Sequence, residues 1–172
     1  MTKTEKEPVA GLAALPGFPL VLVTVKQNIL TAAAFSFFSF QPTPAVMVGI
    51  RPATYTFELL QHAKDFGINI PTPDQLDIVR WVGSVSGREE EKFNREELTP
   101  MEGAVIESVL IQECPVNLEC KLVHQVQYTG SHHWFIGNIV AVHVDEEYQR
   151  DDAIMYWFGE YRRVGEIFYK GR

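Results

Sequence analysis

The sequence has few cysteines, fewer basic than acidic residues and no long apolar run. Its 172 residues include two cysteines, too few for a disulfide framework. Lysine and arginine number 15 against 22 aspartates and glutamates, a net charge of -7. Nucleic-acid binding requires clustered basic side chains, and a bilayer-spanning helix requires about 20 apolar residues. We therefore expect a protein that binds neither nucleic acid nor membranes.

The N-terminus and the cysteines both favour a cytoplasmic protein. The first residues mix acidic with basic side chains, and Pro16 and Pro19 interrupt the apolar run that follows, unlike a signal peptide. If one strand contained both Cys114 and Cys120, their separation of roughly 20 Å would exceed the reach of a disulfide. We expect them to be buried, reduced cysteines in the cytoplasm.

Apolar and alternating segments predict a mainly β protein. Strands are expected at 18–25, 29–37, 45–50, 65–71, 108–114, 117–130 and 133–147, with helices at 54–64 and 73–83. The last two strands should form an antiparallel hairpin, and residues 151–172 are expected to be mostly irregular. We expect a flexible tail at 1–8 and a single domain at 9–172, a closed or split β-barrel with helices packed against it.

The segment 28–44, NILTAAAFSFFSFQPTP, combines small and hydroxyl-bearing residues with phenylalanines. Ala33 and Ala34 leave space beside the backbone, while Thr31, Ser36 and Ser39 offer hydrogen-bond donors and acceptors. Such a strand suits a planar, polar heterocycle. The alternative is a tight barrel corner, where small residues simply fit.

A strand end followed by a helix start predicts a place for a phosphate. Arg51 ends one strand, and Thr54, Tyr55 and Thr56 stand at the start of the next helix. A guanidinium and free backbone N–H groups both attract anions. The alternative is that the threonines are ordinary helix caps.

Four motifs, in order, resemble the flavin reductase-like, FMN-binding split-barrel family, especially its flavoredoxin-like branch. They are NILTAAAFSFFSFQPTPAVMVGIRPATYTFELL, FGINIP, SGREEEKF and GSHHWFIGNIVAV, within roughly residues 15–145. The resemblance implies a Greek-key-like split β-barrel that binds FMN near the interface of a homodimer.

The resemblance also implies residue roles. The ring of the flavin would contact Thr31, Ala33, Ala34, Ser36 and Ser39. The phosphate would lie near Arg51, Tyr55 and Thr56, and further cofactor contacts are expected from Asn69, Ser86, Gly87 and Lys92. The alternative for Lys92 is a solvated side chain in a charge-rich loop.

Three positions decide how closely the family pattern is followed. The family often has an aromatic residue at Ala34 and a basic residue at Thr54, so the phosphate would meet one cation fewer here. His132 is the catalytic candidate, because the resemblance places such a histidine on the nicotinamide side of the flavin. The family has an acidic residue immediately before this histidine, and this sequence has Ser131 there. We therefore expect His132 to position a substrate rather than to act as a strong acid. A surface histidine is the alternative.

Three functions remain open from the sequence. The first is a reductase that passes electrons from NAD(P)H through bound FMN to a flavin, metal or protein acceptor. The second is a flavoredoxin-like electron carrier reduced by a protein partner, and the third is a non-catalytic binder of FMN or another planar ligand. The sequence has no G-x-G-x-x-G fingerprint, so NAD(P)H would bind transiently. No metal site is expected, because the histidines show no ligand spacing.

Overall fold

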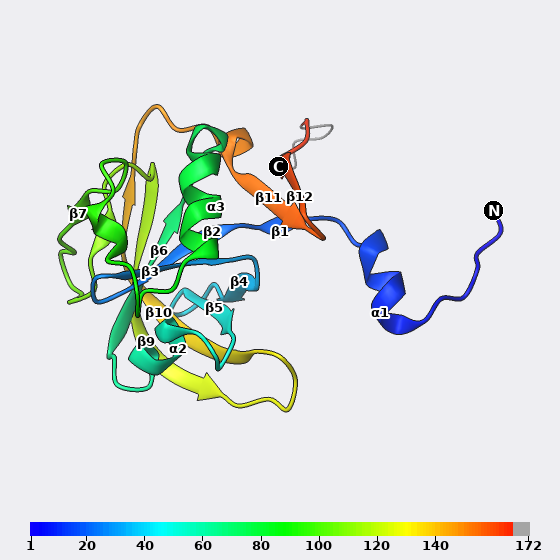
Figure 1. Cartoon of the computed structure of the whole chain (residues 1–172), viewed down its shortest axis with the longest axis horizontal. Helices are drawn as coiled ribbons and strands as arrows, with labels where there is room; N and C mark the ends of the chain where they lie inside the picture. The colour runs from blue at the N-terminus through cyan, green and yellow to red at the C-terminus, as the bar shows by residue number, and fades with distance from the viewer. Residues whose placement is uncertain (167–172) are drawn as a thin grey trace.

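A seven-stranded antiparallel sheet organises the chain (Figure 1). The computed structural model describes residues 1–166. The strands are β1 (Phe18–Pro19), β2 (Val21–Val25), β3 (Asn28–Ala32), β4 (Phe35–Ser39), β5 (Ala45–Ile50), β6 (Asp65–Ile70), β7 (Pro100–Met101), β8 (Leu110–Ile111), β9 (Val116–Val126), β10 (His133–Val144), β11 (Ile154–Trp157) and β12 (Glu160–Arg163). The α-helices are α1 (Pro8–Gly11), α2 (Tyr55–Leu60) and α3 (Leu76–Ser84), and the 3₁₀ turns are η1 (Leu12–Ala14), η2 (Pro73–Gln75), η3 (Lys92–Asn94) and η4 (Arg150–Asp152). The expected mainly β fold is confirmed.

The order of the large sheet is β3-β2-β6-β9-β10-β5-β4. The hairpin β9–β10 lies in its middle, as the sequence predicts, and β10 pairs with β5 from His133↔Ile50 to Asn138↔Ala45. Strands β3 and β4 are consecutive in the chain but lie at the two opposite edges of the sheet. The link between them, Ala33 and Ala34, therefore crosses from one edge to the other.

Two apolar clusters stabilise this arrangement. The five residues of β2 are all buried, which agrees with the continuous apolar run seen in the sequence. The first cluster fills the inside of the curved sheet around Phe66 and Phe135. The second lies between the sheet and α3, where Val79 and Val82 pack on Ile29. Figure 1 shows α3 standing against the sheet, where it packs on β3.

Several predicted elements have different limits in the structure. The single strand expected at 29–37 is two strands, because the chain leaves β3 after Ala32 and enters β4 at Phe35. Its small residues allow close approach at this point, where the Gly49 N–H donates to the Ala34 carbonyl at 2.7 Å. The second helix of the sequence prediction, at 73–83, forms as η2 and α3, but the first ends at Leu60 instead of residue 64. The strand expected at 108–114 is reduced to β8.

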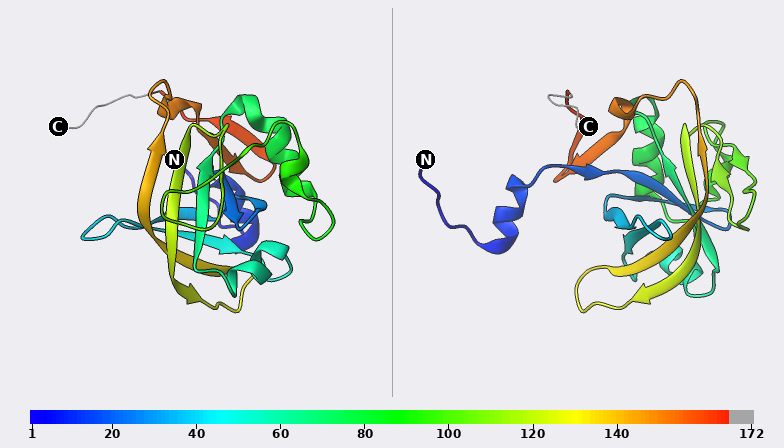
Figure 2. Two further views of the ribbon diagram at one scale, coloured as in Figure 1. Left: turned by 90° about the vertical axis from the view of Figure 1, so that its left-hand side faces the viewer. Right: turned by 180° about the vertical axis from the view of Figure 1, so that it is seen from behind.

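The prediction of an irregular C-terminal segment is wrong for residues 154–163. These residues form the hairpin β11–β12, and β11 also pairs with β1. The two turn residues, Phe158 and Gly159, have φ values of 48° and 86°, as in the tight turns that suit twisted hairpins. The segment α1–η1 projects from the body beside this hairpin (Figure 2), where Trp157 Nε1 donates to the Leu12 carbonyl at 2.7 Å. Residues 167–172 of the same prediction lie outside the described residues.

Both cysteines are free and buried, as predicted from the sequence. Cys114 lies before β9 instead of inside one strand with Cys120. Burial raises the pKa of the Cys114 thiol to about 12, so it is a neutral thiol at physiological pH. Within residues 1–166, no helix has both the length and the apolar character needed to cross a membrane.

Candidate functional site

The turn between β5 and α2 places Arg51 and Thr54 at the surface of the sheet end. Thr54 caps α2: its Oγ1 accepts from the Phe57 N–H at 3.3 Å and donates to the Arg51 carbonyl at 2.9 Å. The capping role expected as an alternative is therefore confirmed for Thr54. For the exposed guanidinium of Arg51, no hydrogen bond or ion pair is recorded with the rest of residues 1–166. The turn thus presents one cation outward.

The end of β5 brings Ala34 and His132 together. A Cβ added to Gly49 would lie 2.9 Å from the Ala34 Cβ and 3.4 Å from both the His132 Cβ and Trp134 Cη2. Because Gly49 has no side chain, the β3–β4 link, the β9–β10 loop and β10 can all approach its backbone closely. The register of β10 on β5 places Arg51 and His132 just beyond the pair His133↔Ile50.

His132 is half-buried and faces a positive neighbour. Partial burial and the charge of Arg51 both hold its pKa below the usual value, so the imidazole is neutral at neutral pH. Its Nδ1 lies 2.7 Å from Ser131 Oγ, so the hydroxyl takes the position where the family's acid would stand. The next histidine, His133, packs edge-on against Phe57 with 5.2 Å between ring centroids, so its side chain contributes to packing.

A second group forms on the other flank of the turn, around Asn28. Its Nδ2 donates to Thr56 Oγ1 at 2.8 Å, and both side chains are buried. A Cβ on Gly87 would lie 1.9 Å from Asn28 Oδ1 and 2.9 Å from Tyr55 Cδ1, so the loop after α3 approaches β3 and α2 closely. Oδ1 of Asn28 is buried with no hydrogen-bond partner within the described chain. The structure thus brings Tyr55, Thr56 and Gly87 together.

Arg88 fastens this loop to α2. Its Nε and Nη2 donate to Glu58 Oε2 at 3.1 and 2.6 Å, and its Nη1 donates to the Ala53 carbonyl at 3.3 Å. The guanidinium lies 5.6 Å from the centroid of the Tyr55 ring. The Arg88 N–H in turn donates to Ser86 Oγ at 3.2 Å, so the predicted residue Ser86 shapes the loop.

Thr31 and Lys92 lie on the α3 side of β3. Thr31 Oγ1 donates to the Val79 carbonyl at 2.7 Å, which ties β3 to the helix. Lys92 is 3% exposed, and its Nζ donates to the carbonyls of Ile29 and Val82 at 2.8 Å each. Burial lowers the pKa of Lys92 to about 8. The alternative of a solvated lysine is therefore wrong, and two of its three N–H groups bind inside the protein.

Ser36 and Ser39 lie on the edge strand β4 among exposed rings. Their hydroxyls donate to carbonyls of their own segment, at 3.2 and 3.3 Å. Phe37, Phe38 and Phe40 are 49%, 56% and 72% exposed. This edge therefore offers hydroxyl groups within an open aromatic surface.

Asn69 is placed apart from the other predicted residues. Its side chain is fully buried and donates to the Leu22 carbonyl at 2.9 Å, while its Oδ1 accepts from the Ile111 N–H and from Asn117 Nδ2, each at 2.9 Å. These bonds join β2, β6, β8 and β9. The structure thus gives Asn69 a role in holding strands together, because its polar atoms are already bonded inside the core.

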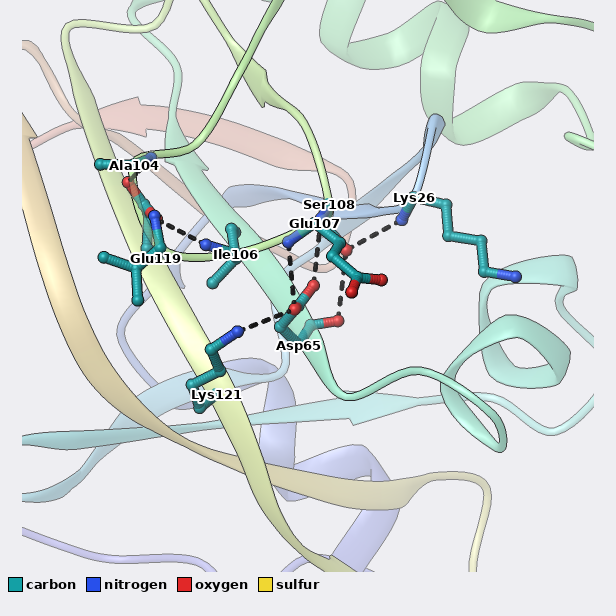
Figure 3. Close-up of polar contacts among 9 residues, drawn as sticks. Lys26, Asp65, Ala104, Ile106, Glu107, Ser108, Glu119 and Lys121 are labelled. Carbon is teal, nitrogen blue, oxygen red and sulfur yellow. Dashed lines mark hydrogen bonds and ion pairs between the residues drawn. The ribbon is translucent and has the colours of Figure 1, made fainter.

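A second polar cluster, on the far strands, holds the loop 102–108 (Figure 3). Glu119 Oε atoms accept from the N–H groups of Ala104, Val105 and Ile106 at 2.7–3.0 Å, and Oε1 lies 2.7 Å from His143 Nε2. Asp65 accepts from the N–H groups of Glu107 and Ser108 and from Lys121 Nζ. The Ser108 hydroxyl also donates to the Asp65 carbonyl at 3.3 Å, so the cluster anchors the loop to β6 and β9.

Three residues beside the turn were not among the predicted site residues: Asn28, Glu58 and Arg88. Asn28 and Arg88 stand within the recognised motifs, NILTAAAF and SGREEEKF, but the sequence gives no sign that one is buried beside Thr56 or that the other reaches α2. Their roles depend on contacts 28 and 30 positions apart in the chain. Within residues 1–166, no group of three or more metal-binding side chains is found.

Comparison with known proteins agrees with this geometry. The flavin reductase like domain matches residues 15–165. An uncharacterized protein of Archaeoglobus fulgidus is 33% identical over 144 residues, which cover 83% of this chain and 80% of that protein. Flavoredoxin of Desulfovibrio vulgaris (Miyazaki F) superposes with a TM-score of 0.83 at 33% identity over 97% of both chains. The FMN-binding protein of Thermus thermophilus, with bound 1-cyclohex-2-enone, gives 0.83 at 25% identity over 99% of both chains. The expected split-barrel fold is confirmed.

Proposed function

Because the chain belongs to the flavin reductase-like family, we propose that it binds FMN and passes electrons from NAD(P)H to a flavin, metal or protein acceptor. The observation that carries this proposal is the arrangement around the turn 51–54. Ala34, Gly49 and His132 converge at its start, and Tyr55 and Gly87 converge just after it. Small residues, hydroxyl groups and a cation thus surround one surface region.

The residues present fit a flavin nucleotide. The link Ala33–Ala34 leaves space beside the backbone for a flat ring, and Ser36 and Ser39 lie on the strand that continues from it. The buried, unpartnered Oδ1 of Asn28 and the outward guanidinium of Arg51 are one acceptor and one cation available to hydroxyl and phosphate groups. We assign the ring to the Ala34 side of the turn and the phosphate to the Arg51–Tyr55 side.

The side chains of the site bind and orient, and the cofactor, when bound, supplies the two-electron redox chemistry. His132 is neutral, and its Nδ1 already bonds to Ser131 Oγ. Its Nε2 can therefore make one hydrogen bond to position a nicotinamide or another substrate beside the ring. Backbone N–H groups of the link that follows Thr31, on the ring side of the turn, would stabilise negative charge that develops on the ring edge.

A flavoredoxin-like electron carrier is the second candidate. Ser131 replaces an acid beside His132, so no carboxylate charges the imidazole for fast proton-linked chemistry. The similarity to flavoredoxin of Desulfovibrio vulgaris favours the same function. In this case a protein partner, instead of NAD(P)H, would reduce the bound flavin.

We propose that the chain forms a homodimer with FMN near the interface. The exposed aromatic side chains of β4, which neighbour Ser36 and Ser39, support an interface on this edge. Light scattering coupled to size-exclusion chromatography measures the mass directly. A monomeric mass at micromolar concentration, with FMN present, would contradict the dimer.

Visible absorbance of the desalted protein, followed anaerobically with NADH and NADPH, tests the function. A bound flavin band that bleaches on mixing supports the reductase. A bound flavin band that persists with both nucleotides supports the electron carrier. The absence of flavin binding, even after incubation with FMN, would contradict both.

Arg51→Ala tests the phosphate side of the assignment. Loss of one charge-assisted hydrogen bond should weaken FMN binding by about 1 to 3 kcal/mol. Fluorescence quenching of FMN on titration with protein measures the affinity. Unchanged affinity would remove Arg51 from the phosphate site.

A further inference from the structure

Arg88 lies against the turn that Arg51 begins, although it comes from a different segment of the chain. Its Nη1 donates to the Ala53 carbonyl at 3.3 Å, and its guanidinium stacks over the Tyr55 ring at 5.6 Å from the centroid. The turn itself carries one cation, because Thr54 is neutral. Arg88 therefore places a second positive charge beside the same backbone.

In this structure the guanidinium of Arg88 forms an ion pair with the carboxylate of Glu58. Nε and Nη2 of Arg88 both bond to Oε2 of Glu58, at 3.1 and 2.6 Å. Oε1 of Glu58 has no recorded partner within the described residues, so the contact uses one oxygen of the acid. The side chains of Arg88 and Glu58 are 45% and 62% exposed, so water screens the pair and can replace either partner.

A phosphate monoester is the stronger partner for this guanidinium. It carries close to two negative charges and three acceptor oxygens. Arginine can donate two parallel hydrogen bonds to two of these oxygens at once. An exposed ion pair contributes little to stability, so exchanging Glu58 for a phosphate has a small cost. The stacking on Tyr55 and the bond to Ala53 would keep the guanidinium in place during the exchange.

From these contacts we infer that Arg88 binds the phosphate of the flavin and that Glu58 competes with that phosphate for it. This inference rests on the proposed function, since it assigns residues to the phosphate side of the same site. It makes Arg88 a determinant of specificity: the residue distinguishes FMN from riboflavin, which has the same ring and ribityl chain but no phosphate. Glu58 opposes phosphate binding both by occupying Arg88 and by its own negative charge.

The test compares FMN and riboflavin affinities of the wild type, Arg88→Gln and Glu58→Gln, measured by fluorescence quenching. Arg88→Gln should weaken FMN binding about tenfold or more, the loss of a charge-assisted bond, and leave riboflavin unchanged. Glu58→Gln should tighten FMN binding severalfold and again leave riboflavin unchanged. The opposite signs of the two effects exclude a general loss of folding as their cause.

Arg95 provides a matched control on another part of the surface. It pairs with Glu97 at 2.9 Å and stacks over Trp81 at 4.9 Å, so Arg95→Gln removes the same kind of pair. We expect no change in either affinity for this variant. FMN binding that is unaffected in Arg88→Gln, or weakened equally with riboflavin, would overturn the role of Arg88 while leaving the flavin function intact. A wild-type protein that binds neither flavin would overturn both.

Discussion

The loop 102–108 and the turn 51–54 differ in how their polar groups are paired. Asp65 and Glu119 are 3% and 0% exposed, and five consecutive backbone N–H groups of the loop donate to them. Beside the turn, Asn28 Oδ1 has no partner within the described residues. Paired buried groups stabilise a fold, whereas unpaired ones are available to a ligand.

The two regions also differ in electrostatics. Burial alone would raise the pKa of Glu119, but His143 and three backbone N–H groups outweigh it and hold the pKa below its usual value. The negative charge is therefore stabilised where it lies. At the turn, burial and then the positive charge of Arg51 lower the pKa of His132. No anion of the described chain pairs with either side chain, and both would accept one as a partner.

The largest expected effect is that of Glu119→Ala. The substitution leaves three backbone N–H groups, of which that of Ile106 is buried, and His143 without their acceptor, so we expect a loss of about 3 to 5 kcal/mol in the free energy of unfolding. Urea denaturation at pH 7 measures it. Because the pKa of Glu119 is lowered on folding, its contribution is present above about pH 4.5 and is lost as the pH falls further, so the difference from wild type should narrow in acid.

Glu97 offers a comparison for that measurement. It is an exposed acid whose side chain pairs with Arg95 within residues 1–166, and water screens this pair, so Glu97→Ala should change stability far less than Glu119→Ala. A Glu119→Ala protein as stable as Glu97→Ala would show that the loop is held by other contacts.

Gly87→Ala should have an intermediate effect on stability, and its structural change should be concentrated around Asn28 and Tyr55. Its new Cβ would lie 1.9 Å from Asn28 Oδ1, so the loop must move away from β3. We expect a cost of about 1 to 3 kcal/mol in stability together with weaker FMN binding. Gly83→Ala is the control, because its Cβ would meet Thr31 at an ordinary 3.4 Å and alanine favours the helix. Equal behaviour of the two variants would contradict the close approach at Gly87.

The smallest effect is electrostatic. Arg51→Ala should raise the pKa of His132, because it removes the neighbouring charge that disfavours the imidazolium. NMR titration of the histidine ring protons measures this shift without any ligand. If the pKa of His132 did not rise, the Arg51 charge would not act on the imidazole, and the assignment of both residues to one site would be contradicted.

Local patterns in the sequence predict the fold well where periodicity and burial coincide. The run 18–25 and the alternating segments of β9 and β10 each form strands as expected. The division of 29–37 was missed because its residues favour a strand throughout, and only the sheet order reveals that Ala33 and Ala34 join two edges. The hairpin β11–β12 was missed because its strands are four residues long and its turn begins with Phe158, a residue that rarely adopts positive φ.

The candidate site was predictable in part, through motif order rather than through contacts. Ala34, Tyr55, Gly87 and His132 lie around the turn, and their roles toward a flavin remain predictions. Asn69 could not be separated from them in the sequence, because a polar residue ending a strand is equally suited to binding and to internal bonding. Arg88 was hidden for the opposite reason: arginine in a charged loop normally contacts water, and its neighbours come from α2.

The order of the large sheet has a consequence for how the chain is made. Strands β3, β2 and β6 form one side and β5 and β4 the other, and all five precede Val116 in the sequence. Strand pairing joins the two sides through β9 and β10, which are the last strands of this sheet to leave the ribosome. During synthesis the chain therefore holds two incomplete sheets with open edges, a state prone to aggregation. We expect the large sheet to be completed only after Val144 has emerged, so that formation of the hairpin β9–β10 ends this vulnerable stage.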